Sequence, residues 1–420
     1  MNITVLGEAK FESPIPYSIS DSLHIPENIV RDPTSTEKEE LEFELAGPRA
    51  KIFFDPKHTC AGIVTCGGLC PGLNNVIRSI FQELHYAYGV KKVLGFRGGY
   101  QGLDPFKGKE PVVLTPEFVN KIHKEGGTVL GTSRGPVDIS IAVDNLIRRG
   151  VNMIFTVGGD GTQRGGNELF QEARKRNYPL AVVGIPKTID NDVAFVARTF
   201  GYLTAISEAS KVLSHAHNEA QSVENGIALV KLMGRHAGFV AAGATVASQE
   251  VNFALLPELP FKLEGPNGFL AALKERIINR SHALIVVAEG AGQNLFTVDE
   301  VKKDDSGNIK AKDIGLFLRD RIEKYFRSEN IPIVMRYIDP SYLVRSSAAN
   351  SADAILCDIF ARNAAHAAMA GKTGLVIGYM HDRFIHVPIE LLTSRKKSMD
   401  PDSYQWKAVH ASTGQINHYE

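Results

Sequence analysis

Residues 152–162 of the chain read NMIFTVGGDGT, a largely apolar run that ends in two glycines, an aspartate, a glycine and a threonine. A short apolar run bounded by glycine is typical of a buried β-strand. Residues 163–176 then have a helical pattern, and residues 180–185, LAVVGI, predict a second buried strand. Strands that alternate with helices predict parallel βαβ units with right-handed crossovers, so this stretch decides the fold class.

The same alternation extends along the rest of the chain. Further strands are predicted at residues 61–65, 92–96, 226–232 and 282–288, and further helices at residues 74–88, 203–223, 236–246 and 351–370. Because the pattern restarts after residue 200, we expect two doubly wound, Rossmann-like α/β lobes that face one another across an active-site cleft. The expected parts are an N-terminal arm at 1–50, a first lobe at 51–198 plus about 346–395, and a second lobe at 199–345 plus about 396–420, which includes the tail.

The composition is that of a globular protein and argues against several other classes. The chain has 420 residues, too many for one core, and its 47 basic residues balance 47 acidic ones. A net charge of zero offers no electrostatic footprint for nucleic acid. No stretch approaches the roughly 18 apolar residues of a membrane span, and no secretory signal is visible, so we expect a cytoplasmic protein without nucleic-acid or membrane partners. The cysteines, which we expect to be reduced and structural, are Cys60, Cys66, Cys70 and Cys357.

Ligands of open parallel sheets bind beyond the carboxyl ends of the strands, so the residues that follow each strand are the first candidates for a site. Residues 66–72, CGGLCPG, follow the strand at 61–65. Gly68 and its glycine neighbours allow a phosphate to approach the main chain, and the amides that begin the next helix favour an anion there. A tight turn between strand and helix is the alternative interpretation. The segment matches neither the dinucleotide fingerprint nor Walker A.

An aspartate follows the strand at 152–157. Asp160 lies between Gly159 and Gly161 and precedes Thr162. A carboxylate in this place suits Mg²⁺, which binds one or two carboxylates together with phosphate oxygens and water. The flanking glycines allow a nucleotide to lie against the main chain. Alternatively, Asp160 is the N-cap of the helix at 163–176.

Two further carboxylates follow the strand at 180–185, in the segment PKTIDND at residues 186–192. Asp190 and Asp192 are two positions apart, and in an extended segment their side chains project to the same side. One carboxylate could then act as a general base and the other as a metal partner, while Lys187 and Thr188 contact the transferred phosphate. The alternative interpretation is a polar Asx turn.

Charged residues also follow other predicted strands and turns. Arg134, in GTSRG at 131–135, has a guanidinium suited to a phosphate oxygen, although a surface arginine is the alternative. In the second lobe, Arg235 and the main chain near Gly234 could hold a sugar phosphate or a sugar hydroxyl, and Glu289 could accept hydrogen bonds from sugar hydroxyls. The alternative for each charged residue is an ordinary salt bridge.

A last group of this kind lies at residues 336–345. Arg336 and Arg345 flank the segment that contains Tyr342, and two arginines with a tyrosine suit a phosphate monoester. Salt bridges are again the alternative. Taken together, the strand ends predict a nucleotide-binding first lobe and a second lobe that binds a sugar phosphate.

In combination these motifs resemble the 6-phosphofructokinase family over roughly residues 46–415. The chain is similar to the long ATP-dependent group of plants, kinetoplastids and some bacteria. The resemblance implies an allosteric enzyme of glycolysis that transfers the γ-phosphoryl group of MgATP to the 1-hydroxyl of fructose 6-phosphate, giving fructose 1,6-bisphosphate and ADP. It also implies a homo-oligomer, a dimer or tetramer, because Arg336 matches an arginine that the family supplies from a neighbouring subunit.

The resemblance implies roles for individual residues. Asp190 would be the base that takes the proton from the 1-hydroxyl, with Lys187, Thr188 and Arg235 as further catalytic residues. Asp160, with Asp192 nearby, would hold Mg²⁺. The residues implied around the ATP phosphates are Gly68, Arg134, Gly159, Asp160, Gly161 and Thr162. Those implied for the sugar phosphate are Thr188, Asp190, Asp192, Met233, Gly234, Arg235, Glu289, Arg336, Tyr342 and Arg345.

Two residues bear on the phosphoryl donor and, taken singly, they point in opposite directions. In the family, Gly161 goes with ATP, because an aspartate there would block and repel the α-phosphate region of the nucleotide. Lys187 also occurs in pyrophosphate-dependent members. The long ATP-dependent group combines both residues, so ATP is the expected donor and pyrophosphate the alternative. A non-catalytic sugar-phosphate sensor is a third possibility, but the complete carboxylate set argues against it.

Overall fold

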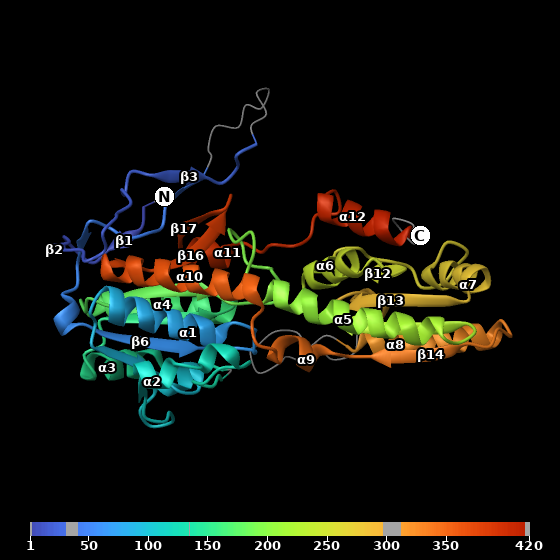
Figure 1. Cartoon of the computed structure of the whole chain (residues 1–420), viewed down its shortest axis with the longest axis horizontal. Helices are drawn as coiled ribbons and strands as arrows, with labels where there is room; N and C mark the ends of the chain where they lie inside the picture. Colours follow the sequence, from blue (N-terminus) through green and yellow to red (C-terminus); the bar gives the residue numbers. More distant parts are fainter. Residues whose placement is uncertain (1, 31–40, 134, 297–311, 416–420) are drawn as a thin grey trace. The chain divides into compact units, whose positions relative to one another are not determined.

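The computed structural model describes residues 2–30, 41–133, 135–296 and 312–415 of the chain. The chain forms two compact units, and the colours of Figure 1 show which parts of the sequence build each. The first unit contains Met1–Thr188, Val193–Gly201 and Ser346–Lys396, and the second contains Ile189–Asp192, Tyr202–Arg345 and Lys397–Glu420. The chain therefore passes between the units several times, and each unit is assembled from segments that are distant in sequence.

The first unit is built on a mostly parallel sheet, which has seven strands among the described residues. Its inner strands run parallel, and the two edge strands, β17 (Arg383–Pro388) and β8 (Val112–Val113), run antiparallel to their neighbours. Three inner strands, β6 (Cys60–Thr65), β9 (Met153–Gly158) and β10 (Ala181–Pro186), are buried along their whole length, which explains their continuous apolar sequences. In spatial order the strands are β17 (Arg383–Pro388), β16 (Leu375–Met380), β10 (Ala181–Pro186), β9 (Met153–Gly158), β6 (Cys60–Thr65), β7 (Lys92–Gly95) and β8 (Val112–Val113).

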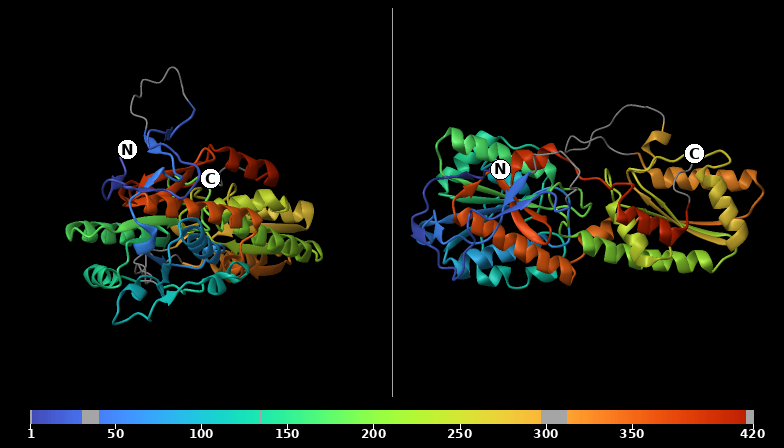
Figure 2. Two further views of the ribbon diagram at one scale, coloured as in Figure 1. Left: turned by 60° about the vertical axis from the view of Figure 1, so that its left-hand side comes forward. Right: turned by 90° about the horizontal axis from the view of Figure 1, so that it is seen from above.

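Helices cover both faces of this sheet, as the view from above in Figure 2 shows. On one face α1 (Leu73–Gln82) packs against α10 (Ser351–Met369), and on the other α3 (Ile139–Arg148) packs against α4 (Asp160–Lys175). A buried cluster of side chains from α3, α4 and the strands fills the space beneath the second pair. The shorter elements of this unit include α2 (Pro116–Val119), α11 (Ile389–Ser394), the 3₁₀ turns Pro56–His58, Gly99–Leu103 and Ile122–Lys124, and a π-helical turn at Glu83–Ala87.

The second unit contains a smaller sheet in which the four strands of the described residues are all parallel. Their spatial order is β12 (Phe253–Leu255), β13 (His282–Ala288), β11 (Gly226–Leu232) and β14 (Val334–Ile338). Helices α5 (Tyr202–Gln221) and α6 (Phe239–Ser248) pack together, while α7 (Phe269–Arg280) and α8 (Ile314–Ser328) enclose an apolar core against β11 and β13. The remaining elements are a 3₁₀ turn at Gln293–Leu295, α9 (Ser341–Ser346) and α12 (Tyr404–Thr413), which packs on α6.

The N-terminal arm crosses the first unit in three short strand pairings. β1 (Thr4–Val5) pairs with β15 (Lys372–Thr373), β2 (Phe11–Glu12) with β5 (Lys51–Ile52), and β3 (His24–Pro26) with β4 (Glu42–Glu44). The β1–β15 and β2–β5 pairings attach the arm to residues beyond it by main-chain hydrogen bonds, whereas the β3–β4 pairing lies within the arm. The arm belongs to the first unit and forms no domain of its own.

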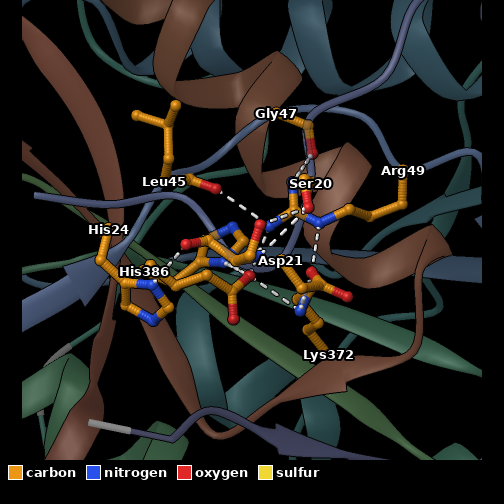
Figure 3. A network of polar contacts seen from close by, with 10 residues as sticks. Ser20, Asp21, His24, Leu45, Gly47, Arg49, Lys372 and His386 are labelled. Atoms are coloured by element: carbon orange, nitrogen blue, oxygen red, sulfur yellow. Dashed lines mark hydrogen bonds and ion pairs between the residues drawn. The ribbon is translucent and has the colours of Figure 1, made fainter.

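A polar network that is buried except at Asp21 holds the end of the arm in place (Figure 3). Arg49 donates to Asp21 at 2.5 Å and pairs with Glu44, and the Lys372 ammonium lies 2.9 Å from Asp21 and 2.7 Å from Glu44. His386 contacts the same Glu44 carboxylate at 3.0 Å. Burial alone would raise the pKa of Glu44, but its hydrogen bonds with His386 and Lys372 lower the pKa well below the ordinary range. The arm is therefore held by paired charges that the sequence pattern did not indicate.

The predicted α/β class, with doubly wound and mainly parallel sheets, is confirmed. The strands at 226–232 and 282–288 have the predicted bounds. Three helices differ from the predicted bounds by three residues or more. The helix predicted at 74–88 changes to a π-helical turn after Gln82, α4 begins three residues earlier than predicted, and α6 begins at Phe239 and not at 236. None of the described helices is both long and apolar enough to cross a membrane.

Candidate active site

The first group of candidate residues lies at one edge of the larger sheet. The strands β6, β9 and β10 are neighbours and parallel, with Thr65 opposite Val157 and Val157 opposite Ile185. Their carboxyl ends therefore lie side by side, at the edge of the sheet where open parallel sheets bind their ligands. These three ends are followed by residues 66–72, called the glycine loop below, by the start of α4 and by Lys187.

Lys187 connects the loops after two of these strands. Its side-chain ammonium donates to the carbonyl of Gly68 at 2.7 Å, and its main-chain amide donates to the carbonyl of Gly158 at 3.1 Å. Only 6% of Lys187 is exposed. Gly67 has a φ of +82°, and a Cβ there would lie 3.3 Å from the Lys187 ammonium. The glycine loop therefore leaves space for the lysine side chain and supplies a carbonyl that holds its ammonium in position.

A second loop supports the glycine loop from the side. The hydroxyl of Thr132 donates to the carbonyl of Gly67 at 2.6 Å, and the amide of Gly67 donates to the carbonyl of Ser133 at 3.3 Å. Sequence reasoning singled out Arg134 in this loop but missed Thr132 and Ser133. Arg134 itself lies outside the described residues.

The start of α4 places an acidic side chain and a bare surface together. Asp160 is the first residue of the helix and Gly159, in extended conformation, is the N-cap, so the alternative in which Asp160 caps the helix is wrong. A carboxylate in the first turn is stabilised by the positive end of the helix dipole. Thr162 is 6% exposed, and a Cβ on Gly158 would lie 2.1 Å from the Thr162 hydroxyl oxygen. The Thr162 side chain thus packs over Gly158.

Gly161 has a different environment from Gly158. It is exposed, and a Cβ there would meet a single atom within 4 Å, a guanidinium nitrogen of Arg164 at 3.9 Å. Its φ lies outside the left-handed region. Neither packing nor backbone conformation of the described chain requires a glycine at this position, so the open surface beside Asp160 is available to a ligand.

The segment that carries Asp190 and Asp192 is not extended. Asn191, between them, has a φ of +55°, which places it in the left-handed region that asparagine tolerates. The expectation of an extended segment, from which the common direction of the two carboxylates was inferred, is therefore wrong. Thr188, whose carbonyl accepts a hydrogen bond from the Thr199 hydroxyl at 2.7 Å, belongs to the first unit, and both aspartates belong to the second.

Lys397 lies beside Asp192 and was missed by sequence reasoning. Its amide donates to the Asp192 carbonyl at 3.3 Å, and its ammonium lies 5.1 Å from the centre of the Phe239 ring. Burial lowers the pKa of Lys397 to about 8, against the opposing effect of the Asp192 charge. The only sequence feature that could have indicated this lysine is the pair of lysines that follows Arg395. Nothing in that pattern pairs one of them with an aspartate 205 positions earlier.

In the second unit, two strand ends meet main chain to main chain. The amide of Glu289 donates to the carbonyl of Leu232 at 2.9 Å, and that of Gly290 donates to the carbonyl of Gly234 at 3.0 Å. A Cβ on Gly290 would lie 1.9 Å from the Arg235 carbonyl oxygen, so glycine is required there. This close approach brings Glu289, after β13, beside the loop of Met233, Gly234 and Arg235, after β11.

The charges around Glu289 come from several elements of the second unit. Burial raises the pKa of Glu289 above its ordinary value, by more than the nearby charges of Arg235, Lys231 and Arg345 lower it, and Asp339 adds to the increase. The structure therefore brings together the predicted residues Glu289, Arg235 and Arg345. A half-buried carboxylate between cationic side chains can accept hydrogen bonds from hydroxyl groups while the cations bind an anion.

Of the predicted residues of β14 and α9, Arg336 and Tyr342 are exposed, and Arg345 is half-buried. The guanidinium carbon of Arg345 is 4.7 Å from the centre of the Tyr342 ring, and Tyr342 is 75% exposed. Arg336 is also exposed, and its ion pair with Glu219 spans 3.9 Å between two exposed side chains. Such a pair contributes little to stability, so a salt bridge is a weak explanation for Arg336.

No group of three or more histidine, cysteine, aspartate or glutamate side chains is arranged to hold a metal ion in the part of the chain that the structure describes. A Mg²⁺ ion bound by one or two carboxylates and by the phosphates of a nucleotide does not need such a group. The half-exposed Asp160, next to the open surface at Gly161, fits a metal ion of that kind.

Fold and site together define a class of α/β proteins with a candidate anion site in each of two units. In one unit the site consists of glycines and acidic groups at the strand ends. In the other it consists of a glutamate and arginines at the strand ends. Residues 60–368, more than half of the chain, match the family described as Phosphofructokinase. The chain belongs to the phosphofructokinase family.

Individual relatives agree with this assignment. A protein of Borreliella burgdorferi described as ATP-dependent 6-phosphofructokinase is 46% identical, over 98% of this chain and 96% of its own. One of Amycolatopsis methanolica with the same description is 42% identical over 99% and 95%, and ATP-dependent 6-phosphofructokinase 7 of Arabidopsis thaliana is 44% identical over 89% and 77%. Among solved structures, pyrophosphate-dependent phosphofructokinase from Marinobacter aquaeolei has a TM-score of 0.70 at 18% identity, over 85% of this chain and 91% of that one. At that identity the likeness concerns the fold alone.

Proposed function

We propose that the chain is an ATP-dependent 6-phosphofructokinase, which transfers the γ-phosphoryl group of MgATP to the 1-hydroxyl of fructose 6-phosphate in glycolysis. The products are fructose 1,6-bisphosphate and ADP. The observation that carries the proposal is the 46% identity, over nearly the full length of both chains, to a relative described by that activity. We also propose that the enzyme is cytoplasmic, in keeping with the expectation from the sequence.

The chemistry requires a base and a set of positive groups. In the proposed mechanism the Asp190 carboxylate accepts the proton of the 1-hydroxyl as its oxygen attacks the γ-phosphorus, and the bond from that phosphorus to the bridging oxygen of the departing ADP breaks. Thr188 and Arg235 orient the reacting groups. Phosphoryl transfer depends mainly on positioning and on stabilisation of charge in the transition state. Asp160 and Asp192 would hold Mg²⁺, and the metal, when bound, neutralises charge on the phosphate oxygens.

Lys187 is proposed to stabilise the charge of the transferred group. Its ammonium is held at 2.7 Å by the Gly68 carbonyl and is almost fully buried, so its position is set before substrate binds. A preorganised charge of this kind loses little energy to reorganisation during the reaction. Gly68, Gly159, Gly161 and Thr162, with Arg134, would then surround the ATP phosphates.

The sugar phosphate is proposed to bind to the second unit. Glu289 would accept hydrogen bonds from the sugar hydroxyls, and the loop with Met233, Gly234 and Arg235 would hold the sugar. Tyr342 and Arg345 would contact the 6-phosphate. Arg336 is proposed to reach the site of a neighbouring subunit in a homodimer or homotetramer, which is supported by its exposure and its weak pairing with Glu219.

The donor is tested by an assay of the purified enzyme with fructose 6-phosphate and either ATP or pyrophosphate. A side chain at Gly161 would meet almost nothing, and this open surface supports a nucleotide beside Asp160. We therefore expect activity with ATP and none with pyrophosphate. The second candidate, a pyrophosphate-dependent enzyme, is favoured by Lys187. Activity with pyrophosphate and none with ATP would reject our choice of donor.

A further inference from the structure

We infer that Lys231 is a positioning residue for the sugar-phosphate site: it ties helix α9, which carries Tyr342 and Arg345, to helix α8 in the core of the second unit. The inference rests on the proposed function, because it concerns the affinity of the same site for fructose 6-phosphate. It assigns to Lys231, Asp313 and Asp339 a role that follows from their contacts.

Lys231 bridges two carboxylates. It lies near the carboxyl end of β11, and its ammonium is 2.8 Å from an Asp313 oxygen and 2.9 Å from an Asp339 oxygen. The lysine side chain is 12% exposed, whereas the side chains of Asp313 and Asp339 are 39% and 37% exposed. The hydroxyl of Tyr337 also donates to Asp313, at 3.4 Å. A nearly buried ammonium between two carboxylates forms short, charge-assisted hydrogen bonds with both.

Asp313 is the fixed end of this bridge. It is the N-cap of α8, and its side chain accepts a hydrogen bond from the amide of Leu316 at 3.1 Å. Helix α8 contributes Ile314, Leu318, Ile322 and Phe326 to the apolar core, and all four are fully buried. Because α8 is held by this packing, Asp313 is held with it.

Asp339 is the end of the bridge that reaches the site. One of its oxygens accepts hydrogen bonds from the Ser341 amide at 3.1 Å and from the Ser341 hydroxyl at 2.5 Å, so it stabilises the start of α9. Helix α9 is only six residues long, and Val344 is its one buried residue. So short a helix is not stable by itself and depends on such contacts for its position. Tyr342 and Arg345, the proposed phosphate contacts, are carried by this helix.

The charge of Lys231 is needed as well as its length. Burial would lower the pKa of Lys231, but the hydrogen bonds with Asp313 and Asp339 raise the pKa by more than burial lowers it. The ammonium therefore stays charged. Burial would likewise raise the pKa of both aspartates, yet hydrogen bonds, including those from Lys231, lower it and keep them ionised. Without the ammonium, two carboxylates would face one another close to Glu289, and α9 would be displaced by their repulsion.

The test compares Lys231→Met, which keeps the apolar stem of the side chain and removes the charge, with the wild-type enzyme in steady-state kinetics. We expect the KM for fructose 6-phosphate to rise about 10- to 100-fold. A loss of affinity of this size is typical when one partner of a charged hydrogen bond is removed. The kcat and the KM for ATP should change by less than about threefold, because the residue touches neither the reacting atoms nor the nucleotide. Lys231→Arg, which restores the charge, should recover most of the affinity.

Lys274→Met is the matched control. Lys274, on α7, pairs at 2.7 Å with Glu329, the residue that follows α8 in the same unit. Both side chains are about one-third exposed, at 32% and 34%. Its removal should leave every kinetic constant unchanged. If Lys231→Met fails to fold, Asp339→Asn weakens the same bridge at α9 alone and should raise the same KM.

Two outcomes would overturn the inference. The first is a KM for fructose 6-phosphate in Lys231→Met that equals the wild-type value. The second is an equal loss for both substrates accompanied by a lower Tm, which would make the bridge merely structural. A wild-type enzyme that does not phosphorylate fructose 6-phosphate at all would instead reject the proposed function, so the two failures are distinguishable.

Discussion

The candidate sites of the two units differ in the groups that form them. The strand ends of the first unit expose main chain: glycines at 67, 68, 159 and 161 leave bare surface, and one buried lysine is fastened to a carbonyl. The strand ends of the second unit carry charged side chains, where Glu289 is surrounded by cations and Lys231 by carboxylates. A site of bare main chain is damaged by adding a side chain, and a site of paired charges is damaged by removing one.

The largest effect should follow removal of a charge from the second unit. Asp190→Ala takes away the proposed base, and general-base catalysis is typically worth about 10²- to 10⁴-fold in rate. We expect kcat to fall by that range while the KM values for ATP and fructose 6-phosphate change little, since a base acts in the transition state. Initial-rate kinetics over both substrates provide the measurement.

Asp320→Ala is the control for this change. Asp320 is an exposed aspartate of the same unit, paired with Arg319 at 2.9 Å, and its loss should leave the rate unchanged. A near-normal kcat in Asp190→Ala would contradict the proposed role and would weaken the idea that charges in the second unit perform the chemistry.

The contrast between the units also explains what the sequence could predict. Local patterns were sufficient for the strands at 226–232 and 282–288 and for the glycine and acidic loops, because apolar runs and glycines act on their own neighbourhood. The bridge of Lys231 was not predictable, since its partners Asp313 and Asp339 lie 82 and 108 positions later. Only the folded sheet brings these side chains together.

Local patterns also failed where backbone conformation departs from the regular elements. The side-chain alternation of a strand predicts an extended segment at residues 186–192, but Asn191 has a left-handed conformation. Asparagine tolerates this conformation without requiring it, so its presence does not predict the change. Similarly, the apolar spacing of residues 74–88 continues through the π-helical turn at Glu83–Ala87. Spacing alone does not reveal the change of hydrogen bonding there.

An intermediate effect should follow the addition of a side chain to the first unit. In Gly161→Asp the new side chain enters open space, so the Tm should stay near that of the wild type. Its carboxylate, close to the proposed phosphates, should raise the KM for ATP about 10- to 100-fold, because like charges near a protein surface repel strongly. Thermal unfolding and ATP kinetics on the same preparation provide the measurement.

Gly158→Ala is the companion variant, three positions earlier. Its Cβ would lie 2.1 Å from the Thr162 hydroxyl oxygen, so overpacking should reduce the free energy of unfolding by about 1–3 kcal/mol. The two glycines thus separate a ligand role from a packing role. A large loss of stability in Gly161→Asp, or unchanged ATP kinetics, would show that Gly161 does not provide nucleotide space.

The smallest effect concerns the pH dependence at Glu289. Because burial raises its pKa above the ordinary 4.5, the folded chain binds this proton more readily than the unfolded chain does. The free energy of unfolding contributed by this group therefore decreases as the pH rises from 4.5 through the raised folded value. In Glu289→Gln no charge forms at this position. The Tm of the variant should therefore increase relative to the Tm of the wild type as the pH rises over that window, and thermal unfolding across a pH series provides the measurement.

Affinity for the sugar should have the opposite dependence on pH. The ionised carboxylate accepts hydrogen bonds from hydroxyl groups, so the wild-type KM for fructose 6-phosphate should rise as the pH falls through the raised pKa. Glu289→Gln should lose this part of the dependence and show a higher KM at neutral pH, by about tenfold or less. Glu264→Gln, at an exposed ion pair of the same unit, controls for the loss of a surface charge. Identical pH profiles for wild type and Glu289→Gln would mean that this carboxylate does not contact the sugar, and the charged surface of the second unit would then bind the phosphate alone.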